Sequence, residues 1–139
     1  MKKLTGLAAF AFTLVSLTAA AGFLQPAPVL VEINEDLSGA AQGDMVTARF
    51  ADNDVELIGC GSTLTSDGFA FGFCQATDAN GVQGFCSTDD AALLQQMRST
   101  ADYSFVRFQW DSDGICTLLR FSTQSFYIPE HTDKKGKNK

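Results

Sequence analysis

Four cysteines constrain the fold of this chain more than any other feature. They lie at positions 60, 74, 86 and 116 of a sequence of 139 residues, so all of them fall within its central and C-terminal parts. A domain of about a hundred residues gains only modest stability from its core, and exported domains of this size are commonly cross-linked. We therefore expect two disulfides that involve Cys60, Cys74, Cys86 and Cys116.

The N-terminal residues predict export. Met1-Lys2-Lys3 is a short positive region, residues 4–18 form an apolar run, and three alanines at 19–21 suit cleavage by signal peptidase. We interpret residues 1–21 as a cleavable signal peptide that leaves no stable membrane anchor. The mature protein is then expected in the periplasm or outside the cell.

The remaining chain divides into three parts. Residues 22–28 contain Pro26 and Pro28 and are predicted to be extended. Residues 29–129 are predicted to form a single β-rich disulfide domain. Residues 130–139 hold four lysines and are predicted to be a basic, disordered tail.

The body of the chain is strongly acidic. Residues 22–133 contain sixteen acidic residues and four arginines, which gives a net charge of −12 before the lysine-rich tail. Such a charge repels phosphate backbones, so we expect no nucleic-acid partner for the folded part.

Alternation with a period of two residues predicts a mainly β fold, with an α+β arrangement as the alternative. We expect an antiparallel meander sheet or a small sandwich of about seven to eight short strands with one three-turn helix. Strands are predicted over residues 29–33, 44–50, 55–60, 69–77, 82–87, 103–110, 115–122 and 126–128. Residues 44–50 and 55–60 are expected to form a hairpin, and residues 34–43 and 61–68 are expected to be loops. The helix is predicted to begin at Ser87, with its hydroxyl as the cap.

Two turns share the arrangement Asp-x-Asn/Asp-Gly. Residues 78–81 and 111–114 both match a type I turn followed by a left-handed glycine. In the first hairpin this turn places Asp78 opposite Val82 and Cys74 opposite Cys86. In the second, the same rule predicts three opposed pairs, which are Trp110 with Cys116, Phe108 with Leu118, and Val106 with Arg120.

The register argument favours one disulfide pairing without settling it. Cys74 opposite Cys86 is within bonding range, which leaves Cys60 for Cys116. The main rival joins Cys60 to Cys74 and Cys86 to Cys116. A zinc site is disfavoured, because the intervals between the cysteines are far longer than zinc knuckles require.

The chain offers few residues that could form a catalytic site, and we expect no enzyme activity. The single histidine, His131, lies beyond Pro129, so no nucleophile has a histidine base within the domain. The carboxylate pairs Asp52/Asp54 and Asp111/Asp113 are interpreted as turn chemistry. A helix-flanked calcium loop that begins at Asp111 would need glutamate where Ser122 stands, so this motif is absent. We expect no metal and no cofactor, with opportunistic cation binding at an acidic surface loop as the alternative.

One hairpin has an aromatic face and a small face. Phe69, Phe71, Phe73 and Phe85 alternate with residues 70, 72, 74, 76 and 84, which are alanine, glycine or cysteine. The favoured interpretation places the phenylalanines in the core. If instead the small face packs beneath the helix, the phenylalanines form a candidate binding surface.

Several residues of the segment 58–128 form a recognisable spacing, which is Gly59-Cys60, Cys74-x-Ala76, Gly81, Cys86, Leu93-Leu94, Tyr103-x-Phe105, Phe108-x-Trp110 and Gly114-x-Cys116. This spacing resembles a group of small exported bacterial proteins with four cysteines. It implies an exported bacterial setting in which the four cysteines belong together. It carries over no activity, ligand or site residue.

Three functions follow as hypotheses. The first is an exported, non-enzymatic binding or structural module that acts on an unidentified protein or small molecule. The second is an inhibitor of an extracellular enzyme, with residues 61–68 or 34–43 inserted into the target. The third and least favoured is a carboxylate-based hydrolase. The oligomeric state is left open.

Overall fold

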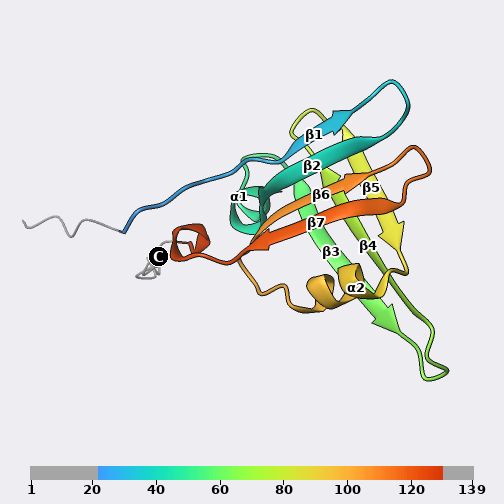
Figure 1. The fold of residues 1–139 in the computed structure, drawn as a ribbon. Coiled ribbons are helices and arrows are strands. Elements are labelled where there is room, and N and C mark those ends of the chain that lie inside the picture. Colours follow the sequence, from blue (N-terminus) through green and yellow to red (C-terminus); the bar gives the residue numbers. More distant parts are fainter. Residues whose placement is uncertain (1–21, 130–139) are drawn as a thin grey trace, which may run out of the picture.

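The computed structural model describes residues 22–129 and contains two antiparallel sheets. One sheet has the strand order β1-β2-β6-β7 and the other has the order β3-β4-β5 (Figure 1). The strands are β1 (Leu30–Ile33), β2 (Gly39–Asp44), β3 (Leu57–Leu64), β4 (Ala70–Thr77), β5 (Gln83–Thr88), β6 (Phe105–Trp110) and β7 (Cys116–Ser122). The helices are α1 (Met45–Arg49), α2 (Ala91–Arg98) and the short 3-10 turn η1 (Ser125–Tyr127). The predicted mainly β, disulfide-linked fold is confirmed. The predicted signal peptide and basic tail lie outside the described residues.

The core lies between the two sheets and beneath α2. Val106 and Phe108 of β6 are fully buried, and Trp110 of the same strand is 6% exposed. The Trp110 indole donates a hydrogen bond to the Leu37 carbonyl at 2.9 Å, which satisfies its one polar group. Alternate residues of β6 therefore include the two largest fully buried side chains, Phe108 and Val106.

Helix α1 occupies Met45–Arg49, so the strand predicted over residues 44–50 was wrong. Asp44 is 1% exposed, and its carboxylate accepts hydrogen bonds from the backbone amides of Thr47 and Ala27 and from the Thr47 hydroxyl. An N-cap of this strength favours helix over the alternating pattern that predicted a strand.

The loop predicted over residues 34–43 is also corrected, because its second half is the inner strand β2. Small residues occupy β2 because bulky neighbours lie directly against it. A Cβ at Gly39 would meet the Trp110 ring at 2.4 Å, and one at Gly43 would meet Val29 at 3.0 Å. Glycine and alanine residues are typical of loops in a sequence, but in β2 they are required because larger side chains would clash with Trp110 and Val29.

Strand β3 runs through the region that was predicted as a loop. It extends to Leu64 and pairs with β4 along its whole length, whereas a hairpin with residues 44–50 had been predicted. Residues 126–128 likewise do not form a strand, because η1 occupies Ser125–Tyr127.

Helix α2 begins later than expected. Its cap is Asp90, whose carboxylate accepts from the amides of Ala92 and Leu93, both at 2.9 Å. The cap predicted at Ser87 was wrong, because β5 continues to Thr88. The helix has eight residues, about two turns rather than three.

The first predicted hairpin register is confirmed and the second is confirmed only at its turn. Cys74 lies opposite Cys86, and Gly81 has the predicted positive φ of 79°. Trp110 lies opposite Cys116, but a bulge at Gln109/Trp110 then shifts the pairing by one residue. Phe108 therefore faces Leu119, and Val106 faces Phe121, in place of the predicted Leu118 and Arg120.

Candidate functional site

The small face of the β4–β5 hairpin packs inward. A Cβ at Gly72 would meet Met97 Sδ at 2.3 Å and Leu94 Cδ2 at 2.9 Å, so α2 rests directly on β4. A Cβ at Gly84 would meet the Trp110 ring at 2.7 Å. Since successive strand residues point to opposite faces, this packing turns the phenylalanines outward.

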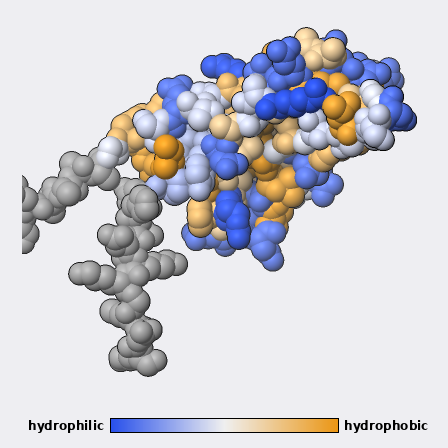
Figure 2. Space-filling model, turned by 90° about the horizontal axis from the view of Figure 1, so that it is seen from below, coloured by the Kyte–Doolittle hydropathy of each residue, from blue (hydrophilic) through white to orange (hydrophobic). Residues whose placement is uncertain are grey.

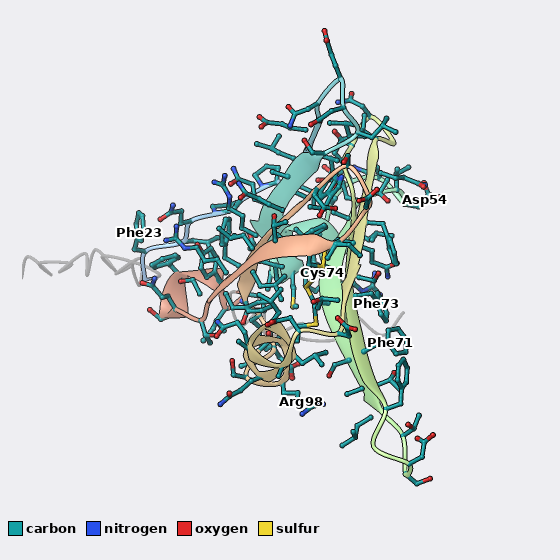
Figure 3. The ribbon with its side chains drawn as sticks, turned by 45° about the vertical axis from the view of Figure 1, so that its right-hand side comes forward. Phe23, Asp54, Phe71, Phe73, Cys74 and Arg98 are labelled. Atoms are coloured by element: carbon teal, nitrogen blue, oxygen red, sulfur yellow. A yellow bond between two sulfur atoms is a disulfide. The ribbon has the colours of Figure 1, made fainter. Side chains whose placement is uncertain are left out.

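The four phenylalanines that we call the aromatic face, Phe69, Phe71, Phe73 and Phe85, consequently do not form the core. Three of them are exposed, at 59% for Phe69, 37% for Phe71 and 56% for Phe85, while Phe73 is half-buried. Figure 3 shows Phe71 and Phe73 pointing away from α2, on the side of β4 opposite to Cys74. The interpretation that placed these rings in the core was wrong, because the helix covers the other face.

The rings form a continuous row. Neighbouring ring centroids lie 6.1 Å apart for Phe69 and Phe71, 6.5 Å for Phe71 and Phe73, and 6.2 Å for Phe73 and Phe85. The interplanar angles are 31°, 29° and 20°, so Phe69 and Phe71 are tilted against each other and the other two pairs are stacked. The row therefore crosses from β4 to β5 as one apolar surface.

Glycine on β3 gives this row its width. The tip of the Phe73 ring lies 3.1 Å from the point where a Gly61 side chain would begin, so the ring leans over β3. Gly59 points to the same side and has nothing within 4 Å of its missing Cβ. The neighbouring strand thus adds a flat backbone floor beside the rings.

Polar but uncharged side chains border the aromatic face. By strand alternation, the outward positions beside it are Thr63, Gln75, Gln83 and Ser87. None of the strands β3, β4 and β5 contains a charged residue. Carboxylates lie at the ends of the row, where Asp67 accepts a hydrogen bond from the Phe69 amide and Figure 3 places Asp54 beyond Phe73. On a chain with sixteen acidic residues, this outer sheet surface lacks charge.

Both disulfides lie beneath the aromatic face. Cys60 is bonded to Cys74 with a Cα–Cα distance of 4.0 Å, and Cys86 is bonded to Cys116 with a distance of 5.1 Å. The favoured pairing of Cys74 with Cys86 and Cys60 with Cys116 was therefore wrong, and its stated rival is observed. The first disulfide joins β3 to β4, and the second joins the two sheets.

The three sulfurs of Cys74, Cys86 and Cys116 lie within 4.8 Å of one another. All four cysteines are in disulfides, so none offers a thiolate to a metal. Within residues 22–129 this is the only cluster of three or more side chains of metal-binding type. The cysteines of this cluster therefore serve as disulfide cross-links.

The acidic pair Asp111/Asp113 belongs to a turn. Asp111 accepts hydrogen bonds from the amides of Asp113 and Ile115 at 3.0 and 2.9 Å, so it organises its turn as predicted.

At the tip of the β3–β4 hairpin, hydrogen bonds from the Thr65 hydroxyl and the Phe69 amide hold the pKa of Asp67 below its ordinary value of 3.8.

A cleft of about 510 Å³ lies between α1 and the start of β3. Its walls are mainly apolar, and Tyr103 at its side adopts a left-handed φ of 62°. A second cleft of about 320 Å³ lies on the other side of α1. Neither cleft was expected, because residues 44–50 were predicted to form a strand. The first cleft is lined by Met45, Val46, Ala48, Arg49, Phe50, Glu56, Leu57, Ile58, Asp102 and Tyr103.

Hydrophobic side chains outside the aromatic face also reach the surface, Leu30, Leu37 and Phe50 among them. Figure 2 shows several separate hydrophobic groups on the face seen from below. Among residues 22–129, no helix has the length and apolar character needed to cross a membrane.

The chain matches no protein-family model, no curated protein and no solved structure.

Proposed function

We propose that the protein is an exported, non-enzymatic binding module whose aromatic face receives a neutral, hydroxyl-rich ligand, a carbohydrate chain. The observation that carries this proposal is the exposure of Phe69, Phe71 and Phe85 in one uncharged row. Contiguous exposed apolar surfaces on small domains commonly serve binding.

The composition of the surface favours a sugar over a charged ligand. Aromatic rings pack against the C–H faces of a sugar, and the amides of Gln75 and Gln83 supply donors and acceptors for its hydroxyl groups. A cationic ligand would be expected at a carboxylate, and an anionic ligand at an arginine, but the strands β3, β4 and β5 contain neither.

The two disulfides support the role of a rigid binding surface in an oxidising compartment. Cys60–Cys74 joins two strands of the aromatic sheet, and Cys86–Cys116 fixes that sheet to the other one. A surface held in this way loses little conformational entropy on binding. Export itself rests on the predicted signal peptide and on the resemblance to exported bacterial proteins.

The test is depletion of the mature protein from solution by insoluble polysaccharides such as cellulose, chitin and peptidoglycan. The double variant Phe71→Ala/Phe85→Ala is expected to remain in solution under conditions that deplete the wild type. Phe50→Ala is the matched control, because Phe50 is 70% exposed and lies at the end of α1, outside the aromatic face.

Circular dichroism and an unreduced mass verify that each variant is folded and cross-linked. Equal depletion of the double variant and the wild type contradicts the assignment of the surface. A wild type that no polysaccharide depletes contradicts the ligand class.

The projecting tip of the β3–β4 hairpin favours inhibition of an extracellular enzyme as a second candidate. Figure 1 shows this tip extending beyond the body of the domain. It is closed by hydrogen bonds from Thr65 N to Phe69 O at 2.8 Å and from Gly68 N to Thr65 O at 3.0 Å. The other predicted inhibitory segment, residues 34–43, is less suited because β2 occupies much of it.

Assays of secreted proteases and glycosidases with the wild type and a Ser66→Trp variant test this second function. Inhibition that the variant loses supports it, and unchanged enzyme rates at equimolar protein contradict it.

A further inference from the structure

Strand β3 forms an open edge of its sheet. The strand order places it beside β4 alone, and none of its eight residues is buried. Its sequence, Leu-Ile-Gly-Cys-Gly-Ser-Thr-Leu, contains no charged residue and no proline. Natural proteins usually protect exposed edges with such residues, so an unprotected edge is a site for pairing with another strand.

The hydrogen-bond pattern shows which residues face the open edge. Thr65 N donates to Phe69 O, so this pair is of the hydrogen-bonded type. Pair types alternate along an antiparallel ladder, so the odd-numbered residues of β3 bond to β4. The amides and carbonyls of Ile58, Cys60, Ser62 and Leu64 therefore point outward. Within residues 22–129, no backbone group of another segment bonds to them.

This edge is complementary to itself. Two β3 strands that run antiparallel with Gly61 opposite Gly61 place Ile58 opposite Leu64 and Cys60 opposite Ser62. All four edge-facing residues of each copy then have a hydrogen-bonding partner. At the centre, the two glycines meet without side chains on the side that carries the aromatic face.

The apolar cleft beside α1 fits the same register. Ile58 lines this cleft together with Met45 and Ala48. Leu64 is 64% exposed at the far end of the strand. Directly opposed residues lie on the same side of a sheet with their Cβ atoms about 5 Å apart. Pairing in this register would therefore place Leu64 of the second copy opposite Ile58, next to the cleft.

We propose that two copies of the chain associate through β3, antiparallel about Gly61, to form one continuous six-stranded sheet. Each copy contributes three strands. The two-fold axis is perpendicular to the sheet, so both aromatic faces lie on the same side and form one longer surface. The association does not depend on the ligand class proposed above.

The test combines sedimentation equilibrium with amide exchange measured by NMR on the mature protein. A dimer is expected at micromolar to millimolar concentration. On dilution, the amides of Ile58, Cys60, Ser62 and Leu64 are expected to lose protection together, while those of the odd-numbered residues of β3 stay protected by β4. A dimer formed through another surface would not produce this alternation of amide protection along β3.

Ser62→Lys places a charge at the open edge and is expected to raise the dimer dissociation constant at least about tenfold. Ser66→Lys is the matched control, because it makes the same change in the hairpin tip beyond β3 and is expected to leave the constant unchanged. A monomer at all concentrations overturns the proposal. So does a dimer in which the even-numbered amides of β3 still exchange rapidly, or one that Ser62→Lys does not weaken.

Discussion

Cys74 faces Cys86 directly across the β4–β5 hairpin, yet its disulfide goes to Cys60 on the other side. The hydrogen-bond pattern explains this choice. Asp78 N donates to Val82 O, which makes Cys74 and Cys86 a hydrogen-bonded pair, whereas Cys60 and Cys74 form a non-hydrogen-bonded pair. Side chains lie closer in pairs of the second type. Cys86 is then free to bond with Cys116 of the other sheet.

The first prediction is a disulfide map. Cleavage before Asp67, Asp78 and Asp89, without reduction, separates the four cysteines. Mass spectrometry is expected to find one fragment that links Cys60 to Cys74 and another that links Cys86 to Cys116. A fragment that links Cys74 to Cys86 would contradict the structure.

The same disulfides predict a stability order. The bonds close loops with sequence separations of 14 and 30 residues. Chain entropy then assigns about 3 kcal/mol to Cys60–Cys74 and about 4 kcal/mol to Cys86–Cys116. Urea unfolding of the two double alanine variants measures both values, and a larger loss for the Cys60/Cys74 variant would oppose this account.

The packing of α2 on β4 predicts unequal effects of three glycine substitutions in one sheet. Gly72→Ala brings a methyl group against Met97 and Leu94 and is expected to lower the free energy of unfolding by about 1–3 kcal/mol. Gly84→Ala meets Trp110 and is expected to behave similarly. Gly59→Ala, with no atom within 4 Å, is the control and is expected to change the free energy by less than about 0.5 kcal/mol. Equal effects at Gly72 and Gly59 would show that the small face is not packed.

The fold class, the first hairpin and the turn residues were accessible from sequence because local chemistry determines them. Asp78 and Gly81 fix the turn, and the turn fixes the register of Cys74 against Cys86. The pairing of β3 was not accessible, because strand partners are set by contacts between distant segments. Gly39 and Gly43 resembled loop residues, although they lie in β2 under Trp110 and Val29.

The candidate site illustrates the same limit. Alternation in residues 69–77 showed that one face was aromatic and the other small. Which face turned inward depended on where α2 and Trp110 came to lie, and no local pattern encodes that choice. Gly72 and Gly84 were nevertheless a signal, since glycine inside a strand often marks a close approach of another element.

The hairpin tip predicts a local pH dependence. The Thr65 hydroxyl, followed by the Phe69 amide, lowers the pKa of Asp67 below 3.8 in the folded state. These bonds therefore stabilise the tip fully above pH 3.8 and are lost as the pH falls through the lowered value. NMR titration of the Asp67 carboxyl carbon is expected to show this low pKa, and Thr65→Val is expected to raise it. Identical titrations in both proteins would rule out the contribution of the hydroxyl.

The most direct measurement of the central claim is an NMR titration of the mature protein with soluble oligosaccharides, followed through the ring resonances of its phenylalanines. Binding at the aromatic face predicts that the signals of Phe69, Phe71, Phe73 and Phe85 shift together and saturably, while that of Phe50 stays in place. The account is contradicted if no sugar moves the four signals, or if a sugar that binds moves only rings elsewhere.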